Sequence, residues 1–571
     1  MKNKYIAGAL ALLLIIFVAV IGVLPRSGVT IKEQGQSYTS EVFNQNRVTT
    51  VDITINEADL AKMLESPLEE KMYAANVTIN GVTVENVGLR TKGNMTLRSV
   101  AQMEDSDRYS FKIDFDKYVD EQNLHGLKKL NLNNNYTDPS QMREYLSYTI
   151  MREMGVPTPA FSYMYVTING KEWGLYLGVE AIEETFLARN YADGAGDLYK
   201  PDGTGSDLKW ISDNIDDYKD INLKTNKGNT DQAALIAMLE AINNGKDIEK
   251  YVNVDEMLRY FAVNTALVNL DSYQGDLKHN YYLYEENGVF SILPWDYNMA
   301  FGGYPVGRGG AGGGGQPPTE QQEADKQQPA QGKANNRDQN QNNQQRGMGA
   351  PGGLGNMGVM NADFLGDDTV NFSITTPVSG TTLADRPLLN ALLSNETYKE
   401  KFQQYLNEIA TKYFSQSYMT NQTSTIANLI SSYVEKDPTK FYTTEQFTQS
   451  VSGEKSLVQF AVKRAESIQA QLSGKLVVEA FTSSDKGGPP GDGGGRGGNR
   501  PAFGGNGNGG QPPPMMNGEA NADNMRPPQM GGAPNTGNAR ISTGTIIMLI
   551  TTSCLLIGAI LFVISFSRRR G

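Results

Sequence analysis

The sequence predicts an α+β protein in which globular segments alternate with low-complexity ones. Alternating apolar and polar residues around Asn-Gly turns predict β-hairpins in the first half of the chain. Apolar residues at helical spacing predict a helical second part. Two tracts rich in Gly, Pro, Asn and Gln, residues 303–360 and 483–540, hold too few large apolar side chains to fold, so they are predicted to be disordered. Globular structure is therefore expected at residues 48–302 and 370–480.

Composition excludes several classes of function. The 571-residue chain carries 63 acidic and 51 basic residues, which speaks against broad nucleic-acid binding. Its single cysteine, Cys554, lies in an apolar segment, so no disulfide can form within the chain. Thiolate-based zinc sites and cysteine nucleophiles are thereby excluded from the globular part, whose stability must depend on its apolar core.

Two apolar segments, residues 5–24 and 545–566, are long enough to cross a bilayer. Lys2 and Lys4 precede the first, and three arginines at 568–570 follow the second. Positively charged flanks mark the cytoplasmic side of a membrane. The sequence therefore predicts two transmembrane helices, cytoplasmic termini and a large extracytoplasmic domain. A cleaved signal peptide is the alternative for the first segment.

The residue patterns predict the following elements. Strands are expected at 51–56, 75–79, 82–90, 109–115, 163–168 and 174–179. Helices are expected at 58–64, between Asp138-Pro139 and Gly155, and over most of 230–268. In the second globular part, helices are expected at 386–393, 398–413, 423–434 and 456–472.

One further hairpin brings polar side chains together. Residues 280–284 and 289–293 alternate as strands around a Glu-Asn-Gly turn. The turn places Asn280 and Asp296 at the same end of the hairpin, shortly after Asp271. A carboxylate and a carboxamide can hold a divalent cation while a second carboxylate orients a hydroxyl, as phosphoryl transfer requires. The ordinary readings are a turn cap for Asp271 and a buried ion pair for Asp296.

Basic side chains precede this hairpin in the order in which protein kinases arrange their parts. Residues 89–98 follow a strand and offer Arg90, Lys92 and Arg98 to cover phosphate groups. A solvated loop is the ordinary reading of this stretch.

A lysine and a glutamate come next. Lys112 lies on the next clear strand and Glu144 on the helix that follows, so their order predicts that the glutamate holds the lysine against the nucleotide. An outward-facing lysine and a surface Arg143–Glu144 pair are the ordinary readings. Glu180 and Lys200 are further candidates for the nucleotide site.

The combined pattern resembles a known family. The stretches that carry the likeness are Arg90-Thr-Lys-Gly-Asn94, Lys129-Leu-Asn-Leu-Asn133, Trp173-Gly-Leu-Tyr176, Asp197-Leu-Tyr-Lys200, His279-Asn280-Tyr-Tyr and Pro294-Trp-Asp296. With them the chain resembles, over roughly residues 50–302, the CotH family, the spore coat protein H type of atypical protein kinase.

The resemblance implies a divergent two-lobed, protein-kinase-like fold, here flanked by the two predicted transmembrane helices. It also implies that ATP and Mg²⁺ or Mn²⁺ are used to phosphorylate Ser or Thr of a protein. By that likeness Asp271 is the catalytic aspartate, and Asn280 and Asp296 are metal ligands. Asp271 and Asn280 are nine positions apart, against about five in the ordinary catalytic loop, so Asp276 is an alternative base.

We therefore expect a membrane-anchored kinase that phosphorylates Ser/Thr-rich proteins of the cell envelope or coat, with ATP and a membrane as partners and no nucleic acid. One alternative is a non-catalytic surface adhesion or scaffold protein. Another is phosphoryl or nucleotidyl transfer to an envelope polymer. The tract at 303–360 begins seven residues after Asp296, where a kinase has its activation segment, and a tolerated surface insertion is its simplest reading.

Overall fold

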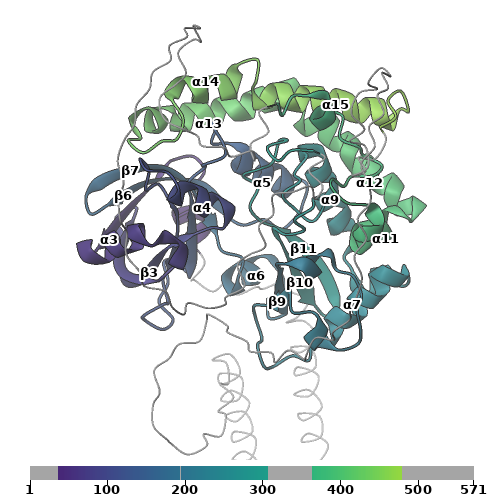
Figure 1. Cartoon of the computed structure of the whole chain (residues 1–571), viewed down its shortest axis with the longest axis horizontal. Coiled ribbons are helices and arrows are strands. Elements are labelled where there is room, and N and C mark those ends of the chain that lie inside the picture. The colour runs from purple at the N-terminus through teal and green to yellow at the C-terminus, as the bar shows by residue number, and fades with distance from the viewer. Residues whose placement is uncertain (1–36, 193, 307–362, 479–571) are drawn as a thin grey trace, which may run out of the picture. The chain divides into compact units, whose positions relative to one another are not determined.

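The computed structural model describes residues 37–192, 194–306 and 363–478 (Figure 1). Its strands are β1 (Thr49–Ile55), β2 (Tyr73–Ile79), β3 (Val82–Lys92), β4 (Ser110–Asp114), β5 (Lys129–Asn133), β6 (Phe161–Ile168), β7 (Lys171–Glu180), β8 (Asp197–Pro201), β9 (Ile221–Leu223), β10 (Tyr281–Glu286) and β11 (Val289–Pro294). Its α-helices are α2 (Tyr38–Glu41), α3 (Glu57–Glu65), α4 (Met95–Ala101), α5 (Arg143–Glu153), α6 (Glu184–Asn190), α7 (Ala233–Asn244), α8 (Ile248–Tyr251), α9 (Val254–Leu267), α10 (Asp367–Val370), α11 (Pro387–Leu393), α12 (Glu396–Glu408), α13 (Gln416–Lys436), α14 (Thr444–Ser452) and α15 (Leu457–Leu472).

The first seven strands close into a barrel in the order β1-β2-β3-β4-β5-β7-β6. Closure comes from β1, which pairs antiparallel with β2 on one side and parallel with β6 on the other. Buried and exposed residues alternate along all of β1, because successive side chains of a strand point to opposite faces. The inward-facing side chains, Val51, Ile53, Leu89 and Ile113 among them, form one apolar core.

The prediction of a two-lobed, kinase-like fold was wrong. The N-terminal strands form a closed barrel of seven, since β1 and β6 pair across a long sequence separation that local patterns do not encode. Within the three described ranges, no helix is long and apolar enough to cross a membrane. The two predicted spans, residues 5–24 and 545–566, lie outside the described residues.

A second sheet has the strand order β11-β10-β8-β9, with every neighbouring pair antiparallel. The β10–β11 pair is the predicted hairpin, and its turn uses Asn287 and Gly288, both with positive φ. The pairing of Tyr281 with Pro294 closes the hairpin at the end opposite the turn. Residues just outside that pair are therefore brought to one place.

Helices cover the barrel on the side of β6 and β7. Figure 1 shows α13 and α14 above the barrel, and α5 between the barrel and α9. Tyr145 of α5 stacks on Tyr163 of β6 with ring centroids 5.0 Å apart, and meets Phe161 edge-on at 4.8 Å. The outward side chains of β6 and β7 thus belong to the main apolar core, which they share with α5, α9 and the C-terminal helices.

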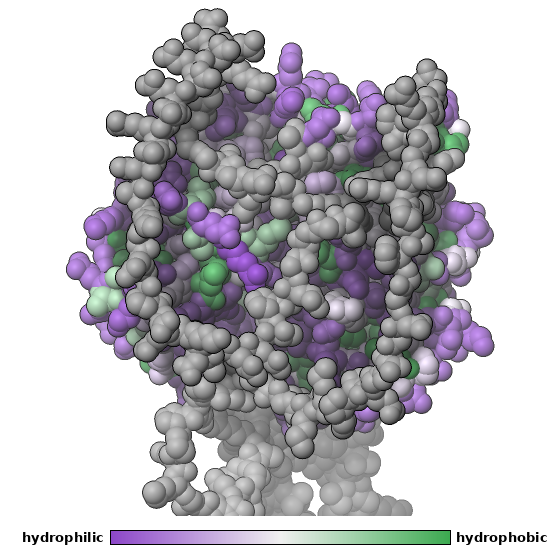
Figure 2. Space-filling view, in the orientation of Figure 1, coloured by the Kyte–Doolittle hydropathy of each residue, from purple (hydrophilic) through white to green (hydrophobic). Residues whose placement is uncertain are grey.

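Hydrophilic side chains predominate on the described surface that is visible in Figure 2, with smaller hydrophobic areas between them. This distribution agrees with an apolar core divided between the barrel interior and the helical layer.

A buried ion pair joins the barrel to the C-terminal helices. Arg108, 1 % exposed, donates to the carboxylate of Asp437 at 2.9 Å, and Asp437 also accepts the N–H of Leu175 at 2.8 Å. Gly174 has φ +116°, and a Cβ there would overlap the Asp437 carboxylate. Only glycine therefore allows this close approach.

Candidate active site

The β10–β11 hairpin presents two polar side chains at its open end. Asn280 immediately precedes Tyr281, and Asp296 follows Pro294 by two residues, so the Tyr281–Pro294 pair brings them together as the sequence predicts. Both have a left-handed backbone, with φ of 59° at Asn280 and 58° at Asp296. Asn and Asp tolerate this conformation best after glycine, but it still has a cost, and such backbones cluster at functional sites.

Asp271 lies in the loop after α9 and is 5 % exposed. His279 Nε2 lies 2.6 Å from its Oδ1, and the Asn280 amide donates to its Oδ2 at 3.1 Å and to its carbonyl at 3.0 Å. Burial would lower the pKa of His279, but the hydrogen bond and the charge of Asp271 raise it overall. Asp271 is thus held in one orientation by two side chains, His279 and Asn280.

The Asp296 carboxylate lacks a hydrogen-bond donor in the described part of the chain, although its backbone N–H donates to the Tyr148 hydroxyl at 3.2 Å. Burial raises its pKa, the Lys92 ammonium opposes that shift, and Asp271 adds to it. His279 and Lys200 also lie within electrostatic range. Asp296 is partly buried, and a carboxylate that is withdrawn from water without a donor is stabilised by a cation beside it.

Lys92, at the end of β3, belongs to the same cluster, and the side-chain amide of Asn133 connects it to Glu144. Its ammonium donates to Asn133 Oδ1 at 2.8 Å, and Asn133 Nδ2 donates to Glu144 Oε2, also at 2.8 Å. Burial lowers the pKa of Lys92, while Asp296 and Glu144 raise it in part. Burial and the charge of Asp296 raise the pKa of Glu144 to about 7.

The predicted pairing of Lys112 with Glu144 does not form. Lys112 lies opposite Arg90 in the β3–β4 register and has Lys129 and Glu183 as its other charged neighbours. Burial, together with Arg90 and Lys129, lowers the pKa of Lys112 to about 8. Sequence order alone favoured Lys112 because it could not show that the last residue of β3 lies nearer to α5.

Of the other predicted nucleotide ligands, Arg90 has an ion-pair partner, Arg98 is exposed, and Lys200 lies near the Asp296 cluster. Arg90 forms an ion pair with Glu70. Arg98 is exposed on α4, because the predicted phosphate loop consists only of Gly93 and Asn94 between β3 and α4. Lys200 lies near Asp296 and Lys92, with its ammonium 5.8 Å from the centroid of the Tyr282 ring.

The Glu180 carboxylate is fully used in hydrogen bonds within the fold. It is fully buried at the end of β7, where it accepts the Tyr38 hydroxyl, Arg189 at 2.5 Å and the Ala160 N–H at 2.8 Å. Asp276, the alternative base, accepts the Tyr304 hydroxyl at 3.1 Å. Neither residue is among the charged neighbours of Asp296.

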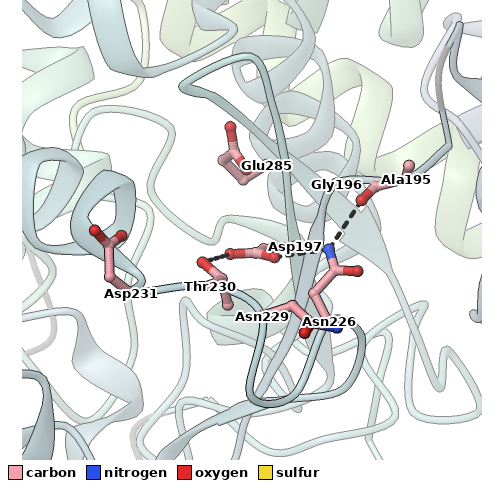
Figure 3. Close-up of a pocket in the computed structure, with 8 residues that line it drawn as sticks. All are labelled: Ala195, Gly196, Asp197, Asn226, Asn229, Thr230, Asp231 and Glu285. Carbon is pink, nitrogen blue, oxygen red and sulfur yellow. Dashed lines mark hydrogen bonds between the residues drawn. The ribbon is translucent and has the colours of Figure 1, made fainter. Parts of the chain in front are cut away.

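A pocket elsewhere on the second sheet does not contribute to this cluster. It is lined by Ala195, Gly196, Asp197, Asn226, Asn229, Thr230, Asp231 and Glu285 (Figure 3). Asp197 pairs with Glu285 near the turn end of β10, whereas the Asp296 cluster lies at the other end of the same strand. The Asp197 carboxylate already accepts Thr230 at 2.7 Å and Asn226 at 2.9 Å.

Asp296 and Asn280 offer a carboxylate and an amide oxygen as candidate ligands for a divalent cation. Among the described residues no group of three or more His, Cys, Asp or Glu could hold a metal ion. Asn280 directs its Nδ2 at Asp271, so its Oδ1 is the atom left to face a ligand beside the Asp296 carboxylate. Carboxylate and amide oxygens are suitable ligands for Mg²⁺ or Mn²⁺, which commonly retain waters and bind substrate phosphates.

Comparison with known proteins identifies the family of this chain. A family model described as CotH kinase protein matches residues 89–468. The chain belongs to the CotH family. This CotH-family chain is 27% identical to the inner spore coat protein H of Bacillus subtilis (strain 168) over 276 residues, which is 45% of this chain and 70% of that protein. It is 36% identical to an inner spore coat protein H-like protein of the same strain over 81 residues, 14% of this chain and 25% of that protein.

Sequence reasoning missed two side chains that shape the CotH-family site. Asn133 bridges Lys92 and Glu144, and Tyr148 of α5 accepts the backbone N–H of Asp296. A signal for Asn133 was present, because it alternates with Leu130 and Leu132 and so lies on the polar face of β5. Tyr148 had no comparable signal, since it lies on a helix that is buried on all sides.

Proposed function

We propose that this CotH-family chain transfers the γ-phosphate of ATP to a Ser or Thr hydroxyl of a protein, with Mg²⁺ or Mn²⁺. The observation that carries the proposal is the partly buried Asp296 carboxylate, which lacks a hydrogen-bond donor in the described ranges and lies within electrostatic range of Lys92 and Asp271. Phosphoryl transfer depends mainly on positioning and on charge stabilisation around the phosphate oxygens, and these residues supply both.

Each residue has a distinct part in the proposal. A bound divalent cation would neutralise charge on the nucleotide phosphates, held by the Asp296 carboxylate and the Asn280 amide oxygen. Lys92 directs its remaining N–H donors toward the same phosphates. Asp271, fixed by His279 and Asn280, retains lone pairs that orient the acceptor hydroxyl and accept its proton.

The acceptor class is proposed from chemistry and from similarity. Asp271 needs a hydroxyl donor in reach, which Ser and Thr supply. One relative is named an inner spore coat protein, so we place the acceptor among proteins of a coat or of the cell envelope.

The test uses the full-length protein with Mn²⁺, a Ser-rich acidic protein, and ATP labelled at either the γ- or the α-phosphate. The Asp296→Ala variant should lose transfer of the γ-label. Asp231→Ala should retain it, because Asp231 is an exposed carboxylate in the separate pocket of Figure 3.

Three outcomes would overturn the proposal. Failure of the wild type to bind nucleotide with metal present would refute nucleotide chemistry. Nucleotide binding without transfer would favour a scaffold, and transfer of the α-label would favour nucleotidyl transfer.

A further inference from the structure

We propose that Asn133 is a positioning residue that joins Lys92 to Glu144, in place of a direct lysine–glutamate ion pair. The proposal rests on the proposed function, because it concerns the lysine that would face the nucleotide. Nothing in the family likeness assigns a role to this asparagine.

The hydrogen bonds define the arrangement. Lys92 Nζ donates to Asn133 Oδ1 and Asn133 Nδ2 donates to Glu144 Oε2, each at 2.8 Å. An ammonium can only donate and a carboxylate can only accept, so one orientation of the amide satisfies both neighbours. In the described part of the chain, the link between Lys92 and Glu144 runs through this amide and not through a direct contact.

The strand register places Asn133 where it can make this link. It is the last residue of β5 and pairs with Leu177 of β7, so its side chain emerges from the barrel next to the apolar layer. Glu144 reaches it from α5 and is 3 % exposed. Both ends of the amide are therefore held by groups that have little freedom to move.

The amide has a chemical consequence. A direct ion pair would cover the lysine with a carboxylate that carries a full charge. Here the ammonium donates one N–H to a neutral oxygen and stays within electrostatic range of Asp296. Glu144 Oε2 accepts the Asn133 amide, and Glu144 Oε1 is buried. Hydrogen bonding with Asn133 and Tyr148 partly opposes the rise in the pKa of Glu144.

A charge exchange tests this arrangement. Asn133→Asp places a carboxylate against Glu144, whereas Asn133→Asp with Glu144→Gln restores the net charge and allows both hydrogen bonds. The Lys92 bond keeps its direction, and the bond between positions 133 and 144 is reversed, because the amide at 144 now donates to the carboxylate at 133. Without nucleotide, the single Asn133→Asp variant should lose several degrees of melting temperature, and the double variant should recover most of that loss. Asn131→Asp is the matched control, because Asn131 lies on the same face and donates to Val179 O at 3.3 Å. Its effect should add to that of Glu144→Gln without recovery.

The positioning role needs a kinetic readout. In Asn133→Ala, kcat should fall about ten- to a hundredfold, the usual range for losing a hydrogen bond to a charged group. The Kd for ATP, measured without turnover, should change far less. The double variant should regain about tenfold or more over Asn133→Asp.

The two proposals fail in different ways. If the melting effects of Asn133→Asp and Glu144→Gln simply add, the amide link is refuted, whether or not the protein turns over ATP. If the melting temperatures recover but kcat does not, Asn133 is structural and the positioning role is refuted. If the wild type transfers no phosphate while the melting cycle shows recovery, the amide link stands and the proposed function fails.

Discussion

The outer face of the barrel has two halves that differ in what they contact. On β6 and β7 the outward residues are aromatic or aliphatic, such as Tyr163 and Leu177, and they are covered by helices. On β3, β4 and β5 the outward residues include Lys92, Lys112 and Asn133, and they face the Asp296 cluster or one another.

The boundary between the halves falls at a single strand pair. Asn131 and Asn133 of β5 lie directly opposite Val179 and Leu177 of β7. The side chains that point into the barrel are apolar in both halves. The alternation of apolar and polar residues along the sequence therefore predicts strands equally well in both. The inward-facing residues therefore stabilise the barrel itself. The outward-facing residues determine which half packs against helices and which half contributes side chains to the candidate site.

The largest effect is expected from breaking the polar half at Asp296. Asp296→Asn should lower kcat/KM a hundred- to a thousandfold, because a charged group that faces the transferred phosphate is lost. The melting temperature should stay the same or rise, since the variant no longer buries an ionisable carboxylate. A kinetic assay beside a melting curve checks both. A large loss of stability with unchanged kcat/KM would assign Asp296 to the fold.

The apolar half should show the reverse behaviour. Leu175→Ala removes a fully buried side chain from the main core and should cost about 2–5 kcal/mol of the free energy of unfolding. Activity per folded molecule should be unchanged. Urea unfolding measures the loss, and a parallel fall in kcat would show that the two halves are coupled.

Within the polar half, the two lysines should differ. Lys92→Met should lower kcat/KM by about ten- to a hundredfold, because Lys92 faces Asp296. Lys112→Met should have a smaller kinetic effect and a neutral or positive effect on stability, because it removes a buried charge beside Arg90 and Lys129. Equal losses in both variants would contradict the assignment of Lys92.

The smallest effect is a difference in pH dependence. Glu144 has an ordinary pKa of 4.5 and a folded-state pKa of about 7, so between these values the folded chain holds a proton that the unfolded chain has released. The contribution of Glu144 to stability should therefore fall as pH rises from about 4.5 to 7. Glu144→Gln should flatten the melting-temperature profile over this range, whereas Leu175→Ala should shift it without changing its slope.

Local chemistry predicted most hairpins and helices. Turn residues Asn80 and Asn169 both have positive φ, and each joins two strands that alternation identified. Asp138 accepts the N–H of Arg143 at 2.8 Å, although α5 begins at Arg143, five residues after Asp138. Closure of the barrel was not predicted, because the parallel pairing of β1 with β6 depends on residues more than a hundred positions apart.

The candidate site was also predicted only in part, because local contacts can be read from the sequence and long-range contacts cannot. Asn280 and Asp296 are joined by one hairpin, so their proximity followed from local turn chemistry. Lys92 and Glu144 meet through a third residue on a different strand, and order along the chain suggested Lys112 instead. Their electrostatic roles stay predictions.

The Arg108–Asp437 ion pair can form only late in the synthesis of the chain. The two residues are 329 positions apart. At about 5–20 residues per second, a ribosome needs roughly 15 to 65 seconds to add the aspartate after the arginine. During that interval Arg108 can donate to the backbone carbonyls of Asn134 and Leu175, but its charge has no carboxylate partner. All seven barrel strands are therefore synthesised long before the carboxylate that pairs with Arg108. A chain that stalls before residue 437 would expose a barrel without this ion pair to proteases and chaperones.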